Sequence, residues 1–171
     1  IMPRLSGLSR QVWIAFGVRV QYIFLSVAAA VLLSEVLKYI IGRSRPFVGG
    51  EANAFNFQHF AGNPAFESLP SGHATTAFAL AFAVSAVWRK ATPVMLLYAV
   101  LICVSRVILL AHHPSDVVGG ALTGVIGAMF VRYWFAARRL GFSIGRDGSI
   151  EPFAGPSGAS LKRVARGALA P

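Results

Sequence analysis

The hydrophobic residues of this chain are gathered into four long runs that are separated by polar segments. The runs cover residues 20–41, 74–88, 93–111 and 117–137. They are continuous and rich in Ala and Leu, without the alternation of polar and apolar positions that a half-buried strand shows. Three of them reach the length of about 20 residues that a membrane-spanning helix needs, whereas the second is shorter. The pattern predicts an all-α integral-membrane helical bundle with four transmembrane helices.

The composition supports a membrane protein. Of the 171 residues, 56% are hydrophobic and 13% are charged, and the mean hydropathy is +0.63. Soluble domains carry about 25% charged residues. The net charge of +10 is also typical of nucleic-acid-binding proteins, but here the basic residues separate apolar runs instead of following one polar face. We therefore expect a membrane partner and no nucleic acid.

The positions of the basic residues predict how the chain is oriented in the membrane. Three basic groups alternate with the runs so that all of them share one side: Arg4, Arg10 and Arg19; Arg89 and Lys90; and Arg138, Arg139, Lys162, Arg163 and Arg166. The positive-inside rule makes this side cytoplasmic. We expect residues 1–140 to form an N-terminally truncated membrane-embedded domain, and residues 141–171, rich in Gly, Pro and Ser, to form a disordered cytoplasmic tail.

The opposite side carries cations that the orientation does not explain. Lys38, Arg45 and Arg106 lie at the ends of runs on this side, without a matching number of acids nearby. Such charges are costly to desolvate unless an anion pairs with them, and arginine binds phosphate oxygens in bidentate fashion. Ser71 and Gly72 directly precede the second run, where backbone N–H groups at a helix N-terminus favour an anion. These residues predict a phosphate-binding site.

Two histidines and one acid on the same side predict chemistry at this site. His112 can attack phosphorus if its ring is neutral, and Asp116, four residues later, can hold the other ring N–H. His73 is then available to protonate the leaving oxygen as a general acid. Arg43, His59 and His113 are left without an assigned role.

The residues around these positions form three motifs. Lys38 to Pro46 reads K-x6-R-P, Pro70 to His73 reads P-S-G-H, and Ser105 to Asp116 reads S-R-x5-H-x3-D. Together they resemble the signature of the type 2 phosphatidic acid phosphatase superfamily. The resemblance implies an all-helical bundle of six membrane helices, of which four are visible here. It also implies that the family's site works without a metal or cofactor.

The resemblance assigns one role to each matching residue. Phosphate would be bound by Lys38, Arg45, Ser71, Gly72 and Arg106, while His73 would be the acid, His112 the nucleophile and Asp116 its partner. The implied activity is that of a phosphoric ester hydrolase on the outer, periplasmic face of a bacterial inner membrane. The candidate substrates are phosphatidic acid, phosphatidylglycerol phosphate, an isoprenoid pyrophosphate and a lipid A phosphate.

The sequence leaves other functions open. Vanadium-dependent haloperoxidases share the same oxyanion site, although the apolar runs argue against a soluble enzyme of that kind. A non-catalytic phosphate-binding membrane protein and a phosphotransferase also fit the motifs. The oligomeric state is not indicated. On the fourth run, a stripe of glycines predicts close helix packing and no further site: Gly119, Gly120, Gly124 and Gly127.

Overall fold

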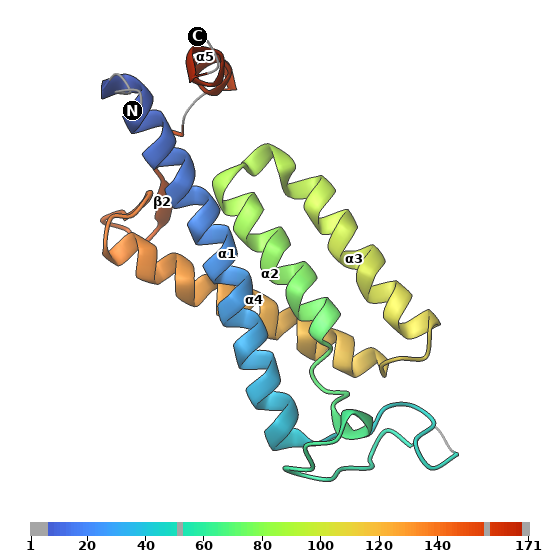
Figure 1. The fold of residues 1–171 in the computed structure, drawn as a ribbon. Helices are drawn as coiled ribbons and strands as arrows, with labels where there is room; N and C mark the ends of the chain where they lie inside the picture. Colours follow the sequence, from blue (N-terminus) through green and yellow to red (C-terminus); the bar gives the residue numbers. More distant parts are fainter. Residues whose placement is uncertain (1–6, 51–52, 156–157, 169–171) are drawn as a thin grey trace.

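The computed structural model describes residues 7–50, 53–155 and 158–168, and most of these are helical (Figure 1). The helices are α1 (Gly7–Ile41), α2 (Gly72–Val87), α3 (Thr92–Ile108), α4 (Pro114–Ala137) and α5 (Gly158–Ala168). Short 3-10 turns lie at Pro64–Phe66 and Arg89–Ala91, and two strands, β1 (Phe142–Ile144) and β2 (Ile150–Pro152), follow α4. The predicted helical class is therefore confirmed.

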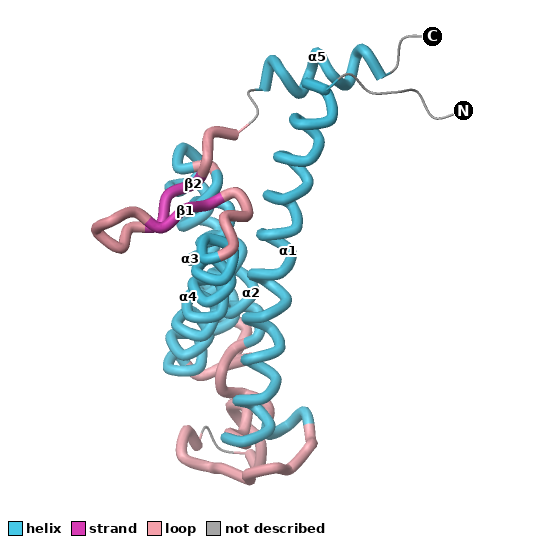
Figure 2. Tube along the Cα trace, turned by 90° about the vertical axis from the view of Figure 1, so that its left-hand side faces the viewer, coloured by secondary structure: helices cyan, strands magenta, loops and turns pink. Residues whose placement is uncertain are grey.

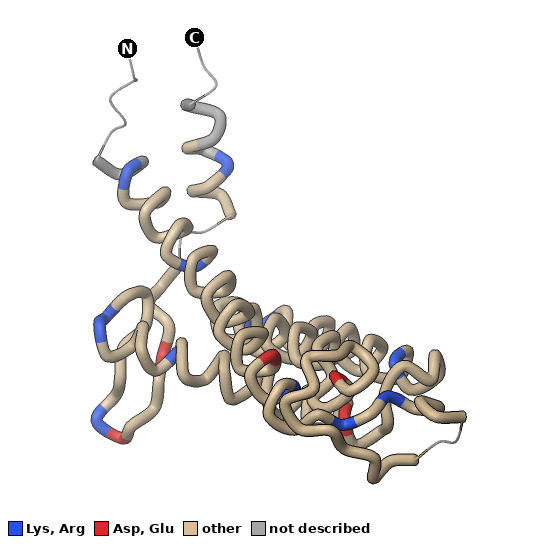
Figure 3. The backbone as a smooth tube through the Cα atoms, turned by 60° about the horizontal axis from the view of Figure 1, so that its bottom comes forward, with Lys and Arg blue, Asp and Glu red and all other residues tan. Residues whose placement is uncertain are grey.

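Three helical stretches of the described chain are long and apolar enough to cross a membrane. They are Arg10–Ile41, Arg89–Ile108 and Pro114–Ala137, while the apolar helix Gly72–Val87 is shorter, as the sequence predicted. Large apolar side chains on α3 point outward, with Leu97 60% and Leu101 59% exposed. Figure 3 shows long uncharged stretches between charged positions that lie mostly near helix ends and in loops. The protein is an integral membrane protein.

Helix α2 is the centre of the bundle and contacts α1, α3 and α4. Its buried positions are mostly alanine, so neighbouring backbones can approach it closely. The predicted role of the glycine stripe on α4 is confirmed here. A Cβ at Gly120 would lie 2.5 Å from the carbonyl oxygen of Ser71, and one at Gly127 would lie 2.6 Å from Cα of Ala30 in α1.

Replacing Gly124 tests this packing. A Cβ there would lie 2.4 Å from the backbone oxygen of Thr75, and a backbone atom cannot rotate away as a side chain can. We expect Gly124→Ala to destabilise the protein by about 1–3 kcal/mol through overpacking. Thermal unfolding in detergent measures the effect. Gly17→Ala in α1 is the control, because a Cβ there would have no atom within 4 Å. Equal melting temperatures for the two variants would contradict the packing argument.

The segment after α4 differs from the disordered tail that the sequence predicted. Strands β1 and β2 pair antiparallel, with Ser143 opposite Glu151. Phe142 is 1% exposed, and its ring centroid lies 4.7 Å from that of Tyr22 in α1. The guanidinium of Arg132 donates to the carbonyl of Ile150 and so ties the hairpin to α4. Figure 2 shows the hairpin beside the bundle and α5 beyond it.

The loop between α1 and α2 folds back under the end of the bundle through backbone hydrogen bonds (Figure 1). Gln58 N donates to Gly42 O at 2.7 Å, and Ser68 N donates to Arg43 O at 3.0 Å. Gly42 has a φ of +60°, and a Cβ there would lie only 1.9 Å from the Gln58 oxygen. The loop thus returns the chain to the end of α1 just before α2 begins.

Candidate active site

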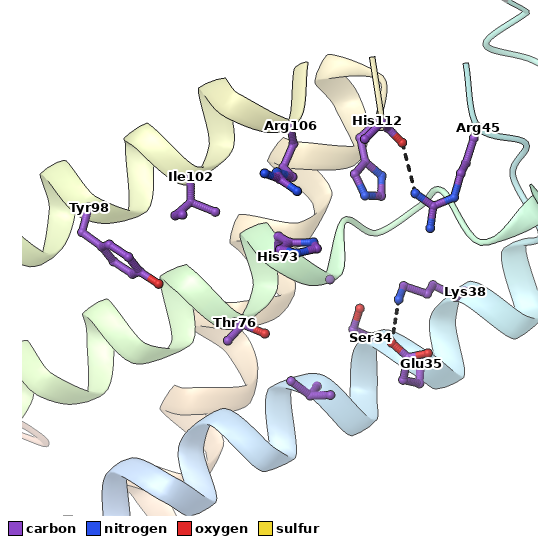
Figure 4. Close-up of a pocket in the computed structure, with 13 residues that line it drawn as sticks. Ser34, Glu35, Lys38, Arg45, His73, Thr76, Tyr98, Ile102, Arg106 and His112 are labelled. Carbon is purple, nitrogen blue, oxygen red and sulfur yellow. Dashed lines mark hydrogen bonds and ion pairs between the residues drawn. The ribbon is translucent and has the colours of Figure 1, made fainter. Parts of the chain in front are cut away.

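The ends of three helices and two loops bring the predicted site residues together (Figure 4). Helix α1 ends near Lys38, α2 begins at Gly72, α3 ends near Arg106, and His112 lies just before α4. They surround a cavity of about 410 Å³. Six of the eight predicted residues line it: Lys38, Arg45, Gly72, His73, Arg106 and His112.

The cavity has a surplus of positive charge. Among the residues that the structure describes, its lining holds the three cations Lys38, Arg45 and Arg106 but one carboxylate, Glu35, which is a surplus of two. Glu35 Oε1 lies 2.6 Å from Lys38 Nζ. The Arg45 guanidinium donates to the carbonyls of Pro64, at 3.0 Å, and Ala111, at 3.3 Å, and these bonds hold it at the cavity. This arrangement favours a dianion such as a phosphate monoester.

The start of α2 adds backbone donors to the same cavity. Gly72 and His73 are the first two helical residues, and the N–H groups of a first helical turn have no intrahelical partner. A Cβ at Gly72 would lie 3.2 Å from Lys38 Nζ, so glycine lets the ammonium group approach the backbone. These donors and the helix dipole both attract an anion.

Ser71 lies differently from what the sequence suggested. It caps α2, is 0% exposed and does not line the cavity. Its N–H donates to the carbonyl of Asp116 at 2.9 Å, so this group is not available to phosphate. Its hydroxyl has no hydrogen-bond partner among the residues that the structure describes. A phosphate contact by Ser71 stays a prediction.

His112 is held with one ring nitrogen available. The side chain is 5% exposed, and its Nδ1 lies 2.8 Å from the carbonyl oxygen of Ser68. A carbonyl only accepts, so Nδ1 is the donor in this contact, and in a neutral ring Nε2 is then the nitrogen with the lone pair. Asp116 Oδ2 lies 3.9 Å from Nδ1, which is too long for a hydrogen bond. Ser68 is therefore the hydrogen-bond partner of the ring, and the role of Asp116 as the partner of His112 stays a prediction.

Asp116 instead holds the loop that carries Ser68. The carboxylate is 0% exposed. Its Oδ1 accepts from Arg43 Nη1 at 2.6 Å, and its Oδ2 accepts from Ser68 Oγ at 2.6 Å and from His113 N at 2.8 Å. Both Arg43 and Asp116 are buried, and neither lines the cavity. Ser68 connects Asp116 with His112, because its hydroxyl donates to the carboxylate and its carbonyl binds the ring.

Arg43 and Ser68 are the residues that sequence reasoning missed. Arg43 had a detectable signal, because it belongs to the cations on the side where the orientation predicts few. Ser68 had none, since its contribution comes from a carbonyl that every residue possesses. His59, whose Nδ1 lies 3.0 Å from the carbonyl of Ile40, and His113 are outside the cavity lining.

The comparison with protein families agrees with this geometry. Residues 19–140, which include every residue of the site, match the family described as the PAP2 superfamily. The chain belongs to the PAP2 superfamily. The resemblance seen in the three motifs is thereby confirmed.

Three curated proteins illustrate the relationship of this PAP2 chain to known proteins. The "Lipid A 1-phosphatase" of Rhizobium johnstonii is 35% identical over 127 residues, which are 74% of this chain and 52% of that protein. The protein of the same name from Rhizobium etli is also 35% identical over 127 residues, 74% of this chain and 55% of that protein. The "Putative undecaprenyl-diphosphatase YbjG" of Escherichia coli is 34% identical over 109 residues, 63% of this chain and 52% of that protein.

The match has a limited extent. The chain spans about half the length of the curated relatives it matches. No solved structure matches the chain significantly.

Proposed function

We propose that this chain provides the active site of a membrane phosphatase that removes a phosphate group from a lipid through a phosphohistidine on His112. The observation that carries the proposal is the position of His112, with Nδ1 bound to a carbonyl and Nε2 available, at a cavity with a surplus of cations. Membership of the PAP2 superfamily and the names of the relatives support the same activity.

The reaction follows from the placement of these groups. Lys38, Arg45, Arg106 and the first N–H groups of α2 bind the phosphate oxygens and stabilise the charge on them in the transition state. Nε2 of His112 attacks phosphorus, and the bond from phosphorus to the lipid oxygen breaks. His73, which lines the same cavity, donates a proton to the departing lipid oxygen.

The second half of the reaction regenerates the enzyme. His73, now neutral, accepts a proton from a water molecule as that water attacks the phosphohistidine. The bond from phosphorus to Nε2 breaks, and inorganic phosphate leaves. We propose that no divalent metal takes part, because the surplus positive charge of the lining repels a cation and already supplies the electrostatic stabilisation.

The surroundings of the cavity support a lipid substrate on the periplasmic face. The cavity lies at the end of helices that are apolar along their length, so an amphiphile can place its phosphate there and its chains in the membrane. This end is opposite the basic turn at Arg89 and Lys90, which the positive-inside rule assigns to the cytoplasm.

A release assay with EDTA present tests this proposal. The purified protein is mixed in detergent with phosphatidic acid, phosphatidylglycerol phosphate, undecaprenyl diphosphate or a lipid A 1-phosphate, and inorganic phosphate is measured. We expect release from at least one lipid at a rate that EDTA does not change. A strict requirement for a divalent metal would contradict the proposal. Halide oxidation on addition of vanadate, without phosphate release, would favour a haloperoxidase.

A further inference from the structure

The cavity continues past its phosphate-binding end, deeper between α1, α2 and α3 (Figure 4). Ser34 precedes Lys38 by four residues in α1, and Thr76 follows Gly72 by four residues in α2. Each therefore lies about one helical turn, roughly 5.4 Å, from the phosphate-binding residue of its own helix. On the third side, Tyr98 of α3, eight residues before Arg106, also lines the cavity. A group attached to the bound phosphate would lie among these three side chains.

The deeper part of the cavity presents neutral hydroxyl groups. Ser34 is 0% exposed, and its Oγ has no hydrogen-bond partner among the described residues. Leaving a buried hydroxyl without a partner is unfavourable, so such a group calls for an explanation. Thr76 and Tyr98 add two more hydroxyls to the same lining. Val31 and Ile102, which also line the cavity, are apolar, while the carboxylate of Glu35, next to Ser34 in the chain, pairs with Lys38.

Three kinds of group can be attached to a lipid phosphate, namely a second phosphate, a hydrocarbon chain or a sugar ring. Uncharged hydroxyls bind these three groups differently. A second phosphate, as in a diphosphate, carries negative charge and would require cations, which lie only at the outer end of the lining. A hydrocarbon chain attached directly to the phosphate would leave the hydroxyls unpaired. A sugar ring carries hydroxyls that both donate and accept, and it matches the neutral polar surface.

We propose that the substrate is a lipid whose phosphate is attached to a sugar ring, and that Ser34, Thr76 and Tyr98 bind the polar groups of that ring. This inference rests on the proposed phosphatase function and names the class of its substrate. These three residues determine which group next to the phosphate is accepted. The cations Lys38, Arg45 and Arg106 bind the phosphate itself. A site built to hydrogen-bond a polar substrate group discriminates against an analogue that lacks the group.

Near-isosteric variants test the inference on two substrates in parallel. Thr76→Val and Tyr98→Phe remove a hydroxyl with little change of shape, and Ser34→Ala removes the buried one. For each variant, kcat/KM is measured with a synthetic lipid A 1-phosphate and with undecaprenyl diphosphate. We expect each substitution to lower kcat/KM about tenfold on the sugar phosphate, the loss of roughly one hydrogen bond. The kcat/KM values for undecaprenyl diphosphate should change little.

Two control variants lie outside the cavity. Ser26→Ala removes a buried hydroxyl from the same helix, two turns before Ser34, and Tyr133→Phe removes an exposed one from α4. Neither substitution should alter the ratio of the kcat/KM values for the two substrates. Equal losses on both substrates, no loss on either, or a loss confined to the diphosphate would overturn the inference.

The outcome also separates this inference from the proposal on which it rests. A wild-type protein that releases phosphate from none of the lipids would overturn both. A wild-type protein that releases phosphate, combined with hydroxyl variants that do not discriminate between substrates, would overturn the sugar-binding inference alone.

Discussion

Replacing His112 with alanine is expected to lower phosphate release by about 10⁴-fold or more, as the loss of a catalytic nucleophile does in other enzymes. The reason is that Nδ1 of this ring is bound to the Ser68 carbonyl, which leaves Nε2 of the neutral ring to attack phosphorus. Initial rates on the best lipid substrate measure the loss, and His112→Gln serves as a second variant if alanine impairs folding.

The covalent intermediate provides a direct measurement. A lipid substrate labelled with ³²P, stopped by rapid quench at alkaline pH, should leave label on the wild-type protein at His112 and none on the variant. His59→Ala is the control, because that ring lies outside the cavity and contacts the carbonyl of Ile40. A His112→Ala protein that releases phosphate at the wild-type rate, or label on another residue, would refute the mechanism.

Replacing Arg43 with methionine is expected to damage both stability and turnover. The substitution leaves the carboxylate of Asp116, which is 0% exposed, without its ion-pair partner. Breaking a buried pair in this way costs about 3–5 kcal/mol, because an uncompensated charge remains in the interior. Thermal unfolding in detergent measures this loss. Arg146→Met in the hairpin turn is the control, because that side chain is exposed.

The kinetics of the Arg43 variant show whether the residue also positions His112. Arg43 does not line the cavity, so we expect kcat to fall by about 10–100-fold while KM changes little. The double variant Arg43→Met with Asp116→Asn removes the unpaired charge and should regain much of the lost stability. Its kcat should stay low, since Ser68 and His112 are no longer held in place. Recovery of kcat together with stability would mean that Arg43 has only a structural role.

Several of the residues that line the cavity could be predicted from the sequence, but the hydrogen bonds that position them could not. The motifs that hold Lys38, Arg45, Gly72, His73 and His112 could be recognised in the sequence, and the structure brings all five to one cavity. Their convergence was predictable because successive membrane helices run in opposite directions. The end of α1, the start of α2, the end of α3 and the start of α4 are therefore expected on the same side of the membrane. The detailed contacts behind His112 were not predictable in this way.

Two differences between the structure and the expectations have a common physical cause. Asp116 was expected to hold His112 because it lies four residues later, but two of its hydrogen bonds come from Arg43 and Ser68, which are 73 and 48 positions away. The tail was expected to be disordered because of its Gly and Pro content, but Phe142 is buried against Tyr22 of α1. In both cases a partner distant in the sequence stabilises a conformation that local composition does not favour.

The sequence by itself determined the helical class, the membrane association, the family and most of the residues that meet at one end of the cavity. These properties depend on the length of apolar runs and on fixed spacings within short segments, which can be read without knowing the fold. The tertiary structure alone decided that the Ser68 carbonyl holds His112, that Arg43 pairs with Asp116, and that neutral hydroxyls continue the cavity. These depend on how a loop and three helices pack, and a packing arrangement is a property of the whole chain.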